Sequence, residues 1–176
     1  SRGRALLTAR SGGRPAELVI GSVQFGVAYG AANRTGKPAR DTTLRLVRRA
    51  ADAGVCSFDT ARSYGDAEER LGEALAGRKV FTTTKLSPLS HLPEDATRGA
   101  VRAAVDGSIA QSLAALKRGS LDRLLLHRAS HMTAFGGAVW ERLREHLAQG
   151  NVAALGVSVQ NPIEAREALA NPTVRH

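Results

Sequence analysis

The chain has 176 residues, of which 43% are apolar and 23% charged, a composition typical of a water-soluble protein with one domain. Its apolar runs are shorter than the roughly 20 residues of a membrane-spanning helix, and its first residues lack the apolar core of a secretory signal, so a cytoplasmic location is expected. A single cysteine, Cys56, excludes an internal disulfide and a cysteine-cluster metal site, and no metal is expected.

The net charge of +9 comes from 21 arginines and 4 lysines against 16 acidic residues. A strong positive charge can indicate nucleic-acid binding. Here the arginines are dispersed, and segments 45–50 and 142–146 place most of theirs on outer faces of helices, as on a solvated surface. We therefore expect no nucleic-acid partner and no membrane partner.

Short apolar runs alternate along the chain with segments of helical periodicity. In chain order, the expected strands are 18–23, 55–60, 80–85, 121–127 and 152–159. The expected helices are 42–54, 66–77, 100–119, 138–150 and 162–170. Thr42 or Asp41 is expected to cap the first helix, and Gly54 and Gly77 are expected to end the first and second.

A strand-then-helix order repeated along the whole chain predicts a parallel sheet. Both an open doubly wound sheet and a (β/α)₈ barrel have this order. The loop 24–38 is long and lacks the G-x-G-x-x-G turn of a dinucleotide-binding doubly wound domain, which favours the barrel. Because a barrel normally takes about 250 residues, we expect an incomplete (β/α)₈ barrel of about five parallel strands over residues 18–176, after an N-terminal arm at 1–17.

Side chains that can carry chemistry follow the expected strands at their carboxyl ends, where parallel α/β folds place active sites. They are Gln24, Asp59, Lys85, His127 and Ser158, with Tyr64 just beyond the second strand. A phenol titrates at about pH 10, but an adjacent ammonium favours the phenolate, and a carboxylate holds that ammonium charged and in place. Asp59, Tyr64 and Lys85 are therefore expected to form a proton relay, with His127 orienting a carbonyl oxygen or sharing the proton transfer.

Each of these residues also has an ordinary structural interpretation. An Asp at a strand end often caps the next loop, a lone lysine is usually solvated, and a lone histidine is more often structural than catalytic. Met132 and Trp140 belong to no stripe and are assigned to packing. The functional interpretation therefore depends on several such groups meeting at one rim of the fold.

The same stretches resemble a known family. Five segments are similar to aldo-keto reductases, in the family's order and spacing: "GSVQFG" (21–26), "FDTARSYGDAEERLG" (58–72), "TTTK" ending at Lys85, "SLAALKRGSLDRLLLH" (112–127) and "ALGVSV" (154–159). The segment "VAYGAANRTGKP" (27–38) resembles a bacterial branch of that family. The resemblance implies a (β/α)₈ barrel that reduces a small-molecule aldehyde or ketone with NADPH.

By this resemblance Tyr64 would be the general acid, assisted by Lys85 and Asp59, and His127 would bind and polarise the carbonyl. The residues implied beside the cofactor, the last of them at its nicotinamide carboxamide, are Gly21, Ser22, Gln24, Asp59 and Ser158. Many members of the family have Asn where this chain has Val159, so one carboxamide contact is expected to be missing.

The resemblance also implies a longer barrel, because the sequence stops about where the family's sixth strand would begin. The loops that hold the adenosine and 2′-phosphate are expected to lie beyond that point, and self-association could cover the open barrel edge. Two other functions stay open here: a non-catalytic barrel remnant acting as an interaction module, and a Schiff-base aldolase with Lys85 as nucleophile. A nearby Asp59 argues against the aldolase, because it would keep the lysine protonated.

Overall fold

A computed structural model of the protein describes residues 17–175 and confirms the expected alternation of strands and helices. The strands are β1 (Val19–Gly21), β2 (Ser57–Asp59), β3 (Phe81–Lys85), β4 (Arg123–Leu126) and β5 (Leu155–Val157). All neighbouring pairs are parallel, and the strand order in the sheet is the order in the chain. The expected arm at 1–17 lies, apart from Glu17, outside the described residues.

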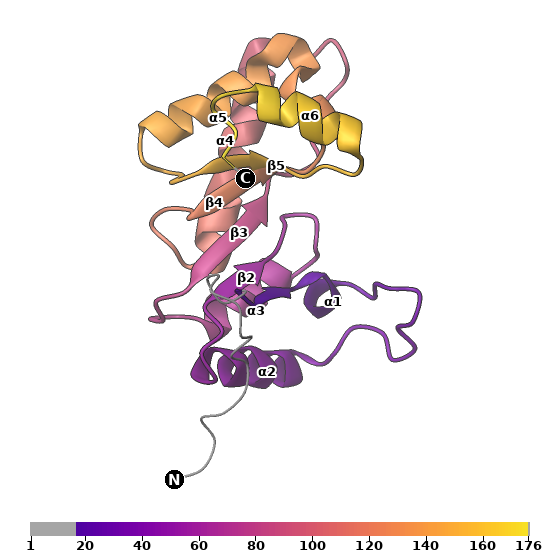
Figure 1. Cartoon of the computed structure of the whole chain (residues 1–176), viewed down its shortest axis with the longest axis vertical. Coiled ribbons are helices and arrows are strands. Elements are labelled where there is room, and N and C mark those ends of the chain that lie inside the picture. The colour runs from indigo at the N-terminus through magenta and orange to yellow at the C-terminus, as the bar shows by residue number, and fades with distance from the viewer. Residues whose placement is uncertain (1–16, 176) are drawn as a thin grey trace, which may run out of the picture.

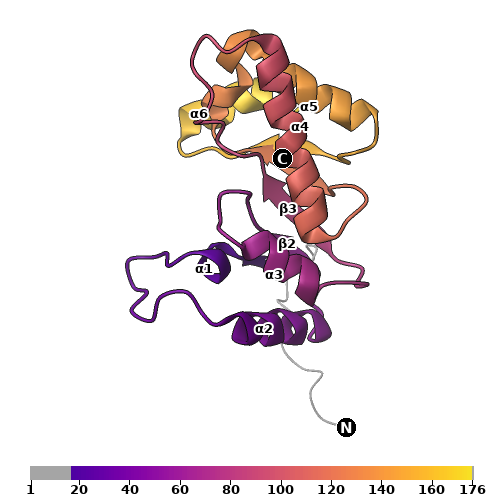
Figure 2. The same ribbon diagram turned by 180° about the vertical axis from the view of Figure 1, so that it is seen from behind.

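Helices follow the strands and lie on one side of the sheet. They are α1 (Val23–Gly26), α2 (Arg40–Asp52), α3 (Ala67–Ala74), α4 (Arg98–Leu116), α5 (Ala138–Ala148) and α6 (Pro162–Ala170), with short 3₁₀ turns η1 (Ala129–Met132) and η2 (Ala134–Gly137) before α5. The helix α4 lies behind the strands in Figure 1 and in front of them in Figure 2, where the molecule is seen from behind. No helix within residues 17–175 is both long enough and apolar enough to cross a membrane.

The hydrophobic core lies between the sheet and these helices. Alternate strand residues point into it, so that Phe58, Leu124 and Leu155 are almost fully buried. The residues between them point to the opposite face, where Val19 is 51% exposed and Phe81 37% exposed. This alternation follows from the two-residue period of a strand.

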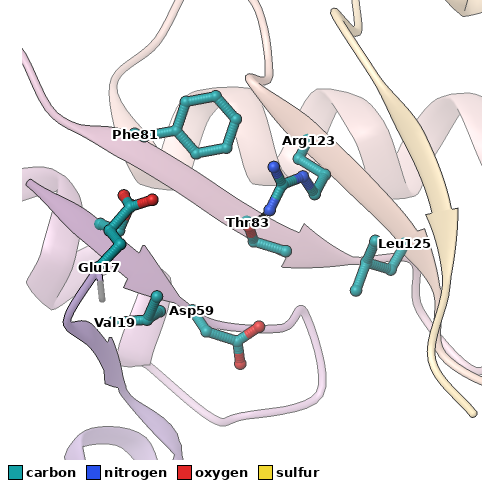
Figure 3. Close-up of a pocket in the computed structure, with 8 residues that line it drawn as sticks. Glu17, Val19, Asp59, Phe81, Thr83, Arg123 and Leu125 are labelled. Carbon is teal, nitrogen blue, oxygen red and sulfur yellow. Dashed lines mark hydrogen bonds between the residues drawn. The ribbon is translucent and has the colours of Figure 1, made fainter. Parts of the chain in front are cut away.

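The face of the sheet opposite the helices is hollow. A cavity of about 370 Å³ lies there, and the side chains that line it are Glu17, Val19, Ser57, Asp59, Phe81, Thr83, Arg123 and Leu125 (Figure 3). The guanidinium carbon of Arg123 lies 4.7 Å from the centre of the Phe81 ring. A doubly wound sheet reverses its strand order and has helices on both faces, whereas this sheet keeps the chain order with helices on one face, which confirms the barrel type.

The boundaries of some elements differ from those expected. The first strand ends at Gly21, and not at residue 23, because the next residues close a helical turn in which the Phe25 amide donates to the Ser22 carbonyl. The expectation that Thr42 or Asp41 caps α2 is wrong. That helix begins two residues earlier, and both residues lie inside it.

Gly54 lies just past the end of α2, as expected, whereas α3 ends at Ala74, three residues before Gly77, so the expectation that Gly77 ends that helix is wrong. Gly54 and Gly77 have φ angles of +97° and +73°, the left-handed conformation that glycine adopts at low cost after a helix. The helix α4 ends before Lys117, which itself takes a left-handed conformation, and so does not reach residue 119. Helix α6 has the bounds expected from its sequence, because the Asn161 side chain accepts hydrogen bonds from the amides of Ile163 and Glu164.

Gly72 allows α3 and α4 to approach closely. A Cβ at this position would lie 2.1 Å from the carbonyl oxygen of Ala115 and 2.8 Å from Cα of Leu116. Backbone atoms of a packed helix cannot move aside as the end of a side chain can, so the contact admits only glycine.

We predict that Gly72→Ala lowers the free energy of unfolding by about 1–3 kcal/mol, the cost of overpacking a core, measured by urea titration. Gly107→Ala is the matched control, because a Cβ there meets nothing within 4 Å inside α4. It should raise the stability by up to about 1 kcal/mol, through helix propensity alone. Equal effects of the two alanines would contradict the role given to Gly72.

Candidate active site

The carboxyl ends of the strands meet at one rim of the sheet. Gly21, at the end of β1, pairs in register with Asp59 at the end of β2. Ser158, just after β5, donates its amide hydrogen to the carbonyl of Leu126, which places it beside the end of β4 and next to His127. Parallel strands in chain order therefore bring together residues that lie far apart in the sequence.

Lys85 is the most buried charged side chain at this rim, with 7% of the residue exposed. Its Nζ donates to Asp59 Oδ1 at 2.7 Å and to the carbonyl oxygen of Thr60 at 3.0 Å. A buried ammonium is stable only when acceptors replace its lost water. The two acceptors come from β2 and the residue after it, and they fix the position of the Lys85 Nζ.

The pairing of β2 with β3 continues beyond the strands and carries the next loop along Lys85. The amide of Thr60 donates to the carbonyl of Thr83 at 2.8 Å, and the amide of Arg62 donates to the carbonyl of Lys85 at 3.2 Å. This short extension directs the chain toward Tyr64.

Tyr64 lies between Lys85 and His127. The Lys85 Nζ is 5.1 Å from the centre of the Tyr64 ring. The rings of Tyr64 and His127 have centres 6.2 Å apart and meet edge to face at 79°. The structure thus brings Asp59, Tyr64, Lys85 and His127 into one cluster.

A close backbone contact with α1 sets the position of Tyr64. A Cβ at Gly26 would lie 1.6 Å from the Tyr64 carbonyl oxygen, and one at Gly65 would lie 2.4 Å from the Gly26 carbonyl oxygen. Gly65 also has a φ angle of +56°. The loop therefore packs backbone against backbone, and the two glycines leave it little freedom to shift.

His127 is expected to be uncharged at neutral pH. Its pKa is lowered first by burial and then by the positive charges of Lys85 and Arg128, while Asp59 acts in the opposite direction. Within the described part of the chain, the buried Nδ1 of His127 has no hydrogen-bond partner. An unpaired ring nitrogen is less costly without its hydrogen than with it, which favours the tautomer that donates from Nε2.

The residues expected beside the cofactor differ in their accessibility. Gly21 is exposed, and Ser158 is half-buried at the rim. Ser22 is fully buried, and its amide donates to the carbonyl of Asp59 at 2.9 Å. Gln24 is exposed, but its side-chain amide donates to the carbonyl of Tyr29 at 3.0 Å and so holds the loop 27–38.

The sequence interpretation missed three contributors to this cluster. Thr60 acts through its backbone carbonyl, for which a sequence contains no signal. Arg62 and Glu68 form an ion pair beneath the loop. Glu68 precedes the buried Leu71 by three residues, which is the spacing of one helical face, and this spacing was the available signal.

The cluster contains a proton donor, a fixed cation and a neutral hydrogen-bond donor around one point of the rim. This combination suits proton delivery to an oxygen atom that gains negative charge. Among residues 17–175, the structure shows no group of three or more His, Cys, Asp and Glu side chains that could hold a metal ion.

Comparisons of the sequence and of the structure with known proteins all find aldo-keto reductases. The family model of the aldo/keto reductase family matches residues 17–175. The 6-dehydroglucose reductase of Novosphingobium aromaticivorans is 36% identical over 127 residues, which cover 65% of this chain and 40% of that protein.

Solved structures have the same fold. A candidate aldo-keto reductase of Pseudomonas aeruginosa is 25% identical with a TM-score of 0.70, over 89% of this chain and 60% of that one. The holo form of an aldo-keto reductase from Bacillus halodurans is 20% identical with a TM-score of 0.68, over 90% and 51%. An aldo/keto reductase from Klebsiella pneumoniae, in complex with NADP and acetate, is 24% identical with a TM-score of 0.60, over 84% and 47%. The chain spans about half the length of the relatives it matches.

The environment of His127 can be tested by NMR titration of the histidine ring signals. We predict a midpoint below the ordinary value of about 6.5. Lys85→Met should raise this midpoint, because the ammonium that opposes the imidazolium is removed while Asp59 remains. Lys79→Met is the control, since Lys79 is exposed and precedes the opposite end of β3. An unchanged midpoint in Lys85→Met would show that the two side chains do not interact.

Proposed function

This chain belongs to the aldo/keto reductase family of oxidoreductases, and we propose that it carries the proton-transfer site of an enzyme that reduces an aldehyde or ketone to an alcohol with NADPH. The observation that supports this proposal most is the Lys85 ammonium, held between Asp59 and the Thr60 carbonyl beside the Tyr64 ring. Because the chain spans about half the length of its relatives, the activity is proposed for the whole protein.

Tyr64 is the proposed general acid. Its hydroxyl hydrogen passes to the carbonyl oxygen of the substrate as the carbonyl carbon is reduced, and a phenolate remains. The Lys85 ammonium stabilises this negative charge, and the charge interaction is strong because Lys85 is shielded from water. Asp59 holds the ammonium in place throughout.

His127 is proposed to orient the substrate. As a neutral imidazole with its hydrogen on Nε2, it can donate a hydrogen bond to the same carbonyl oxygen without adding a charge that would compete for the Tyr64 proton. This hydrogen bond polarises the carbonyl group and fixes the oxygen within reach of the phenol.

The rim suits the nicotinamide end of the proposed cofactor, which would supply a hydride to the carbonyl carbon. Ser158 presents a hydroxyl beside His127, and Gly21 leaves space at the end of β1, so a neutral hydrogen-bonding ring could be held there. The buried Ser22 hydroxyl is placed less well for such a contact. The structure described as a complex with NADP, from Klebsiella pneumoniae, supports NADP as the dinucleotide.

The substrate is proposed to be a polyhydroxylated carbonyl compound of the sugar type. The support is the relative named 6-dehydroglucose reductase, with 36% identity over the matched residues. A Schiff-base aldolase would instead need an uncharged lysine as nucleophile. Lys85 Nζ donates hydrogen bonds to Asp59 and to the Thr60 carbonyl, and these contacts argue against that alternative.

We further propose that additional strands cover the hollow face of the sheet in the working protein. Phe81 and Val19 are partly exposed there, and the edges of β1 and β5 have free pairing positions within the described residues. Either a longer chain or a second copy would supply these strands. Intact mass and size-exclusion chromatography of the native protein distinguish the two, and a native monomer of 18.6 kDa would contradict both.

We predict that Tyr64→Phe, in the full-length protein, lowers the turnover of NADPH with an aldehyde by about 10²–10⁴-fold, the usual contribution of general acid catalysis. The circular dichroism spectrum should not change, because only one hydroxyl is lost. Tyr29→Phe is the matched control, since the chain has two tyrosines and Tyr29 is 60% exposed. Full turnover by Tyr64→Phe would refute the proposed mechanism, and a barrel remnant would neither bind NADPH nor turn it over.

A further inference from the structure

Glu68 is an acidic side chain with no exposed surface, in the first turn of α3. Its Oε1 accepts a hydrogen bond from the Thr84 hydroxyl at 2.6 Å, and its Oε2 pairs with the guanidinium of Arg62. Burial raises the pKa of Glu68, while Thr84, Arg62 and the nearby Ser112 side chain of α4 act against that rise. A buried carboxylate requires such partners.

The donors to Glu68 belong to the elements that form the active site. Arg62 lies in the loop between Asp59 and Tyr64, and its backbone amide bonds to the carbonyl of Lys85. Thr84 immediately precedes Lys85 on β3 and points to the opposite face of the sheet. Glu68 therefore connects, from the helix side, the segment that carries the phenol and the strand that carries the ammonium.

We propose that Glu68 is a positioning residue that holds the Tyr64 loop against the end of β3 and thereby sets the separation between the Tyr64 phenol and the Lys85 ammonium. This role rests on the proposed carbonyl reduction. Glu68 touches neither group directly, and it acts through Arg62 and Thr84.

Glu69 provides an internal comparison. It accepts a hydrogen bond from the same Arg62 guanidinium at 3.0 Å, but its side chain is 42% exposed. Solvent can therefore take the place of the Glu69 carboxylate when it is removed, whereas the Glu68 side chain has no exposed surface. If the effect depended only on a negative charge near Arg62, the two residues would contribute equally.

The test is Glu68→Gln in the full-length protein. Gln keeps the size of the side chain but removes the negative charge that faces the Arg62 guanidinium. Because the Arg62 guanidinium then loses its buried charged partner, the loop should open more often, and hydrogen exchange at the Arg62 backbone amide, which bonds to the Lys85 carbonyl, should become about tenfold faster. The Ser158 amide bonds to the Leu126 carbonyl near the β5 edge of the sheet, away from Arg62. Its exchange should change by less than about twofold.

Kinetics supply a second measurement on the same protein. The kcat for carbonyl reduction should fall about tenfold or more, as for a small misplacement of a catalytic group. The KM values should stay within about twofold, because the proposed binding groups are untouched. Glu69→Gln is the matched control and should change neither exchange nor kcat.

If Glu68→Gln does not fold, Thr84→Val is the variant to test in its place. It removes the hydroxyl that donates to Glu68 and retains the carboxylate with its Arg62 partner. Thr82→Val is its control, because the Thr82 hydroxyl also bonds a carboxylate, that of Asp122 at 2.9 Å, at the other end of β3. Only Thr84→Val should speed exchange at Arg62 and lower kcat.

The outcomes separate this role from the proposed function. Faster exchange at Arg62 and Ser158 alike, unchanged exchange at Arg62, or equal effects of Glu68→Gln and Glu69→Gln would overturn the positioning role. A different result would refute the proposed function alone: Glu68→Gln speeds exchange only at Arg62, but the wild-type protein has no reductase activity. That result would still support the link from Glu68 to the loop.

Discussion

The ammonium of Lys85 imposes the constraint on which the site depends. A cation with so little exposure must have acceptors within the fold, and Asp59 and the carbonyl of Thr60 provide them. Both acceptors belong to β2 or its extension, so β2 and β3 have to pair in one register through residue 62. The loop that leaves this register then carries Tyr64 to the side of Lys85.

Backbone packing limits that loop from two other directions. The α1 turn meets it at Gly26 and Gly65, where carbonyl groups occupy the space of a Cβ. On the helix side, Gly72 allows α4 to pack closely against α3. The buried Glu68, with its partners Arg62 and Thr84, lies beneath the loop. Because α3 begins directly after the loop, the packing of α3 against α4 also limits where the loop can place Tyr64 at the rim.

The two faces of the sheet have different roles in this chain. The helix face is a packed apolar core, and the buried Glu68 carboxylate beneath the Tyr64 loop has partners on the loop and on β3. The opposite face contains a cavity that reaches Asp59 and has Phe81 and Arg123 along its wall (Figure 3). In a closed barrel that face is the packed interior. The proposed proton-transfer residues therefore lie at the ends of β2 and β3 or in the segments that directly follow β2 and β4, while the proposed enzyme needs more strands around them.

The sequence by itself determined the alternation of strands and helices, the parallel sheet and the placement of Asp59, Lys85 and His127 at one rim. These features follow from local periodicity and from the rule that parallel strands end on the same side. Only the tertiary structure decided that α2 begins after Ala39, that Ser22 is buried and that Thr60 and Glu68 support the site. Those features depend on contacts between residues distant in the chain, for which local patterns contain no information.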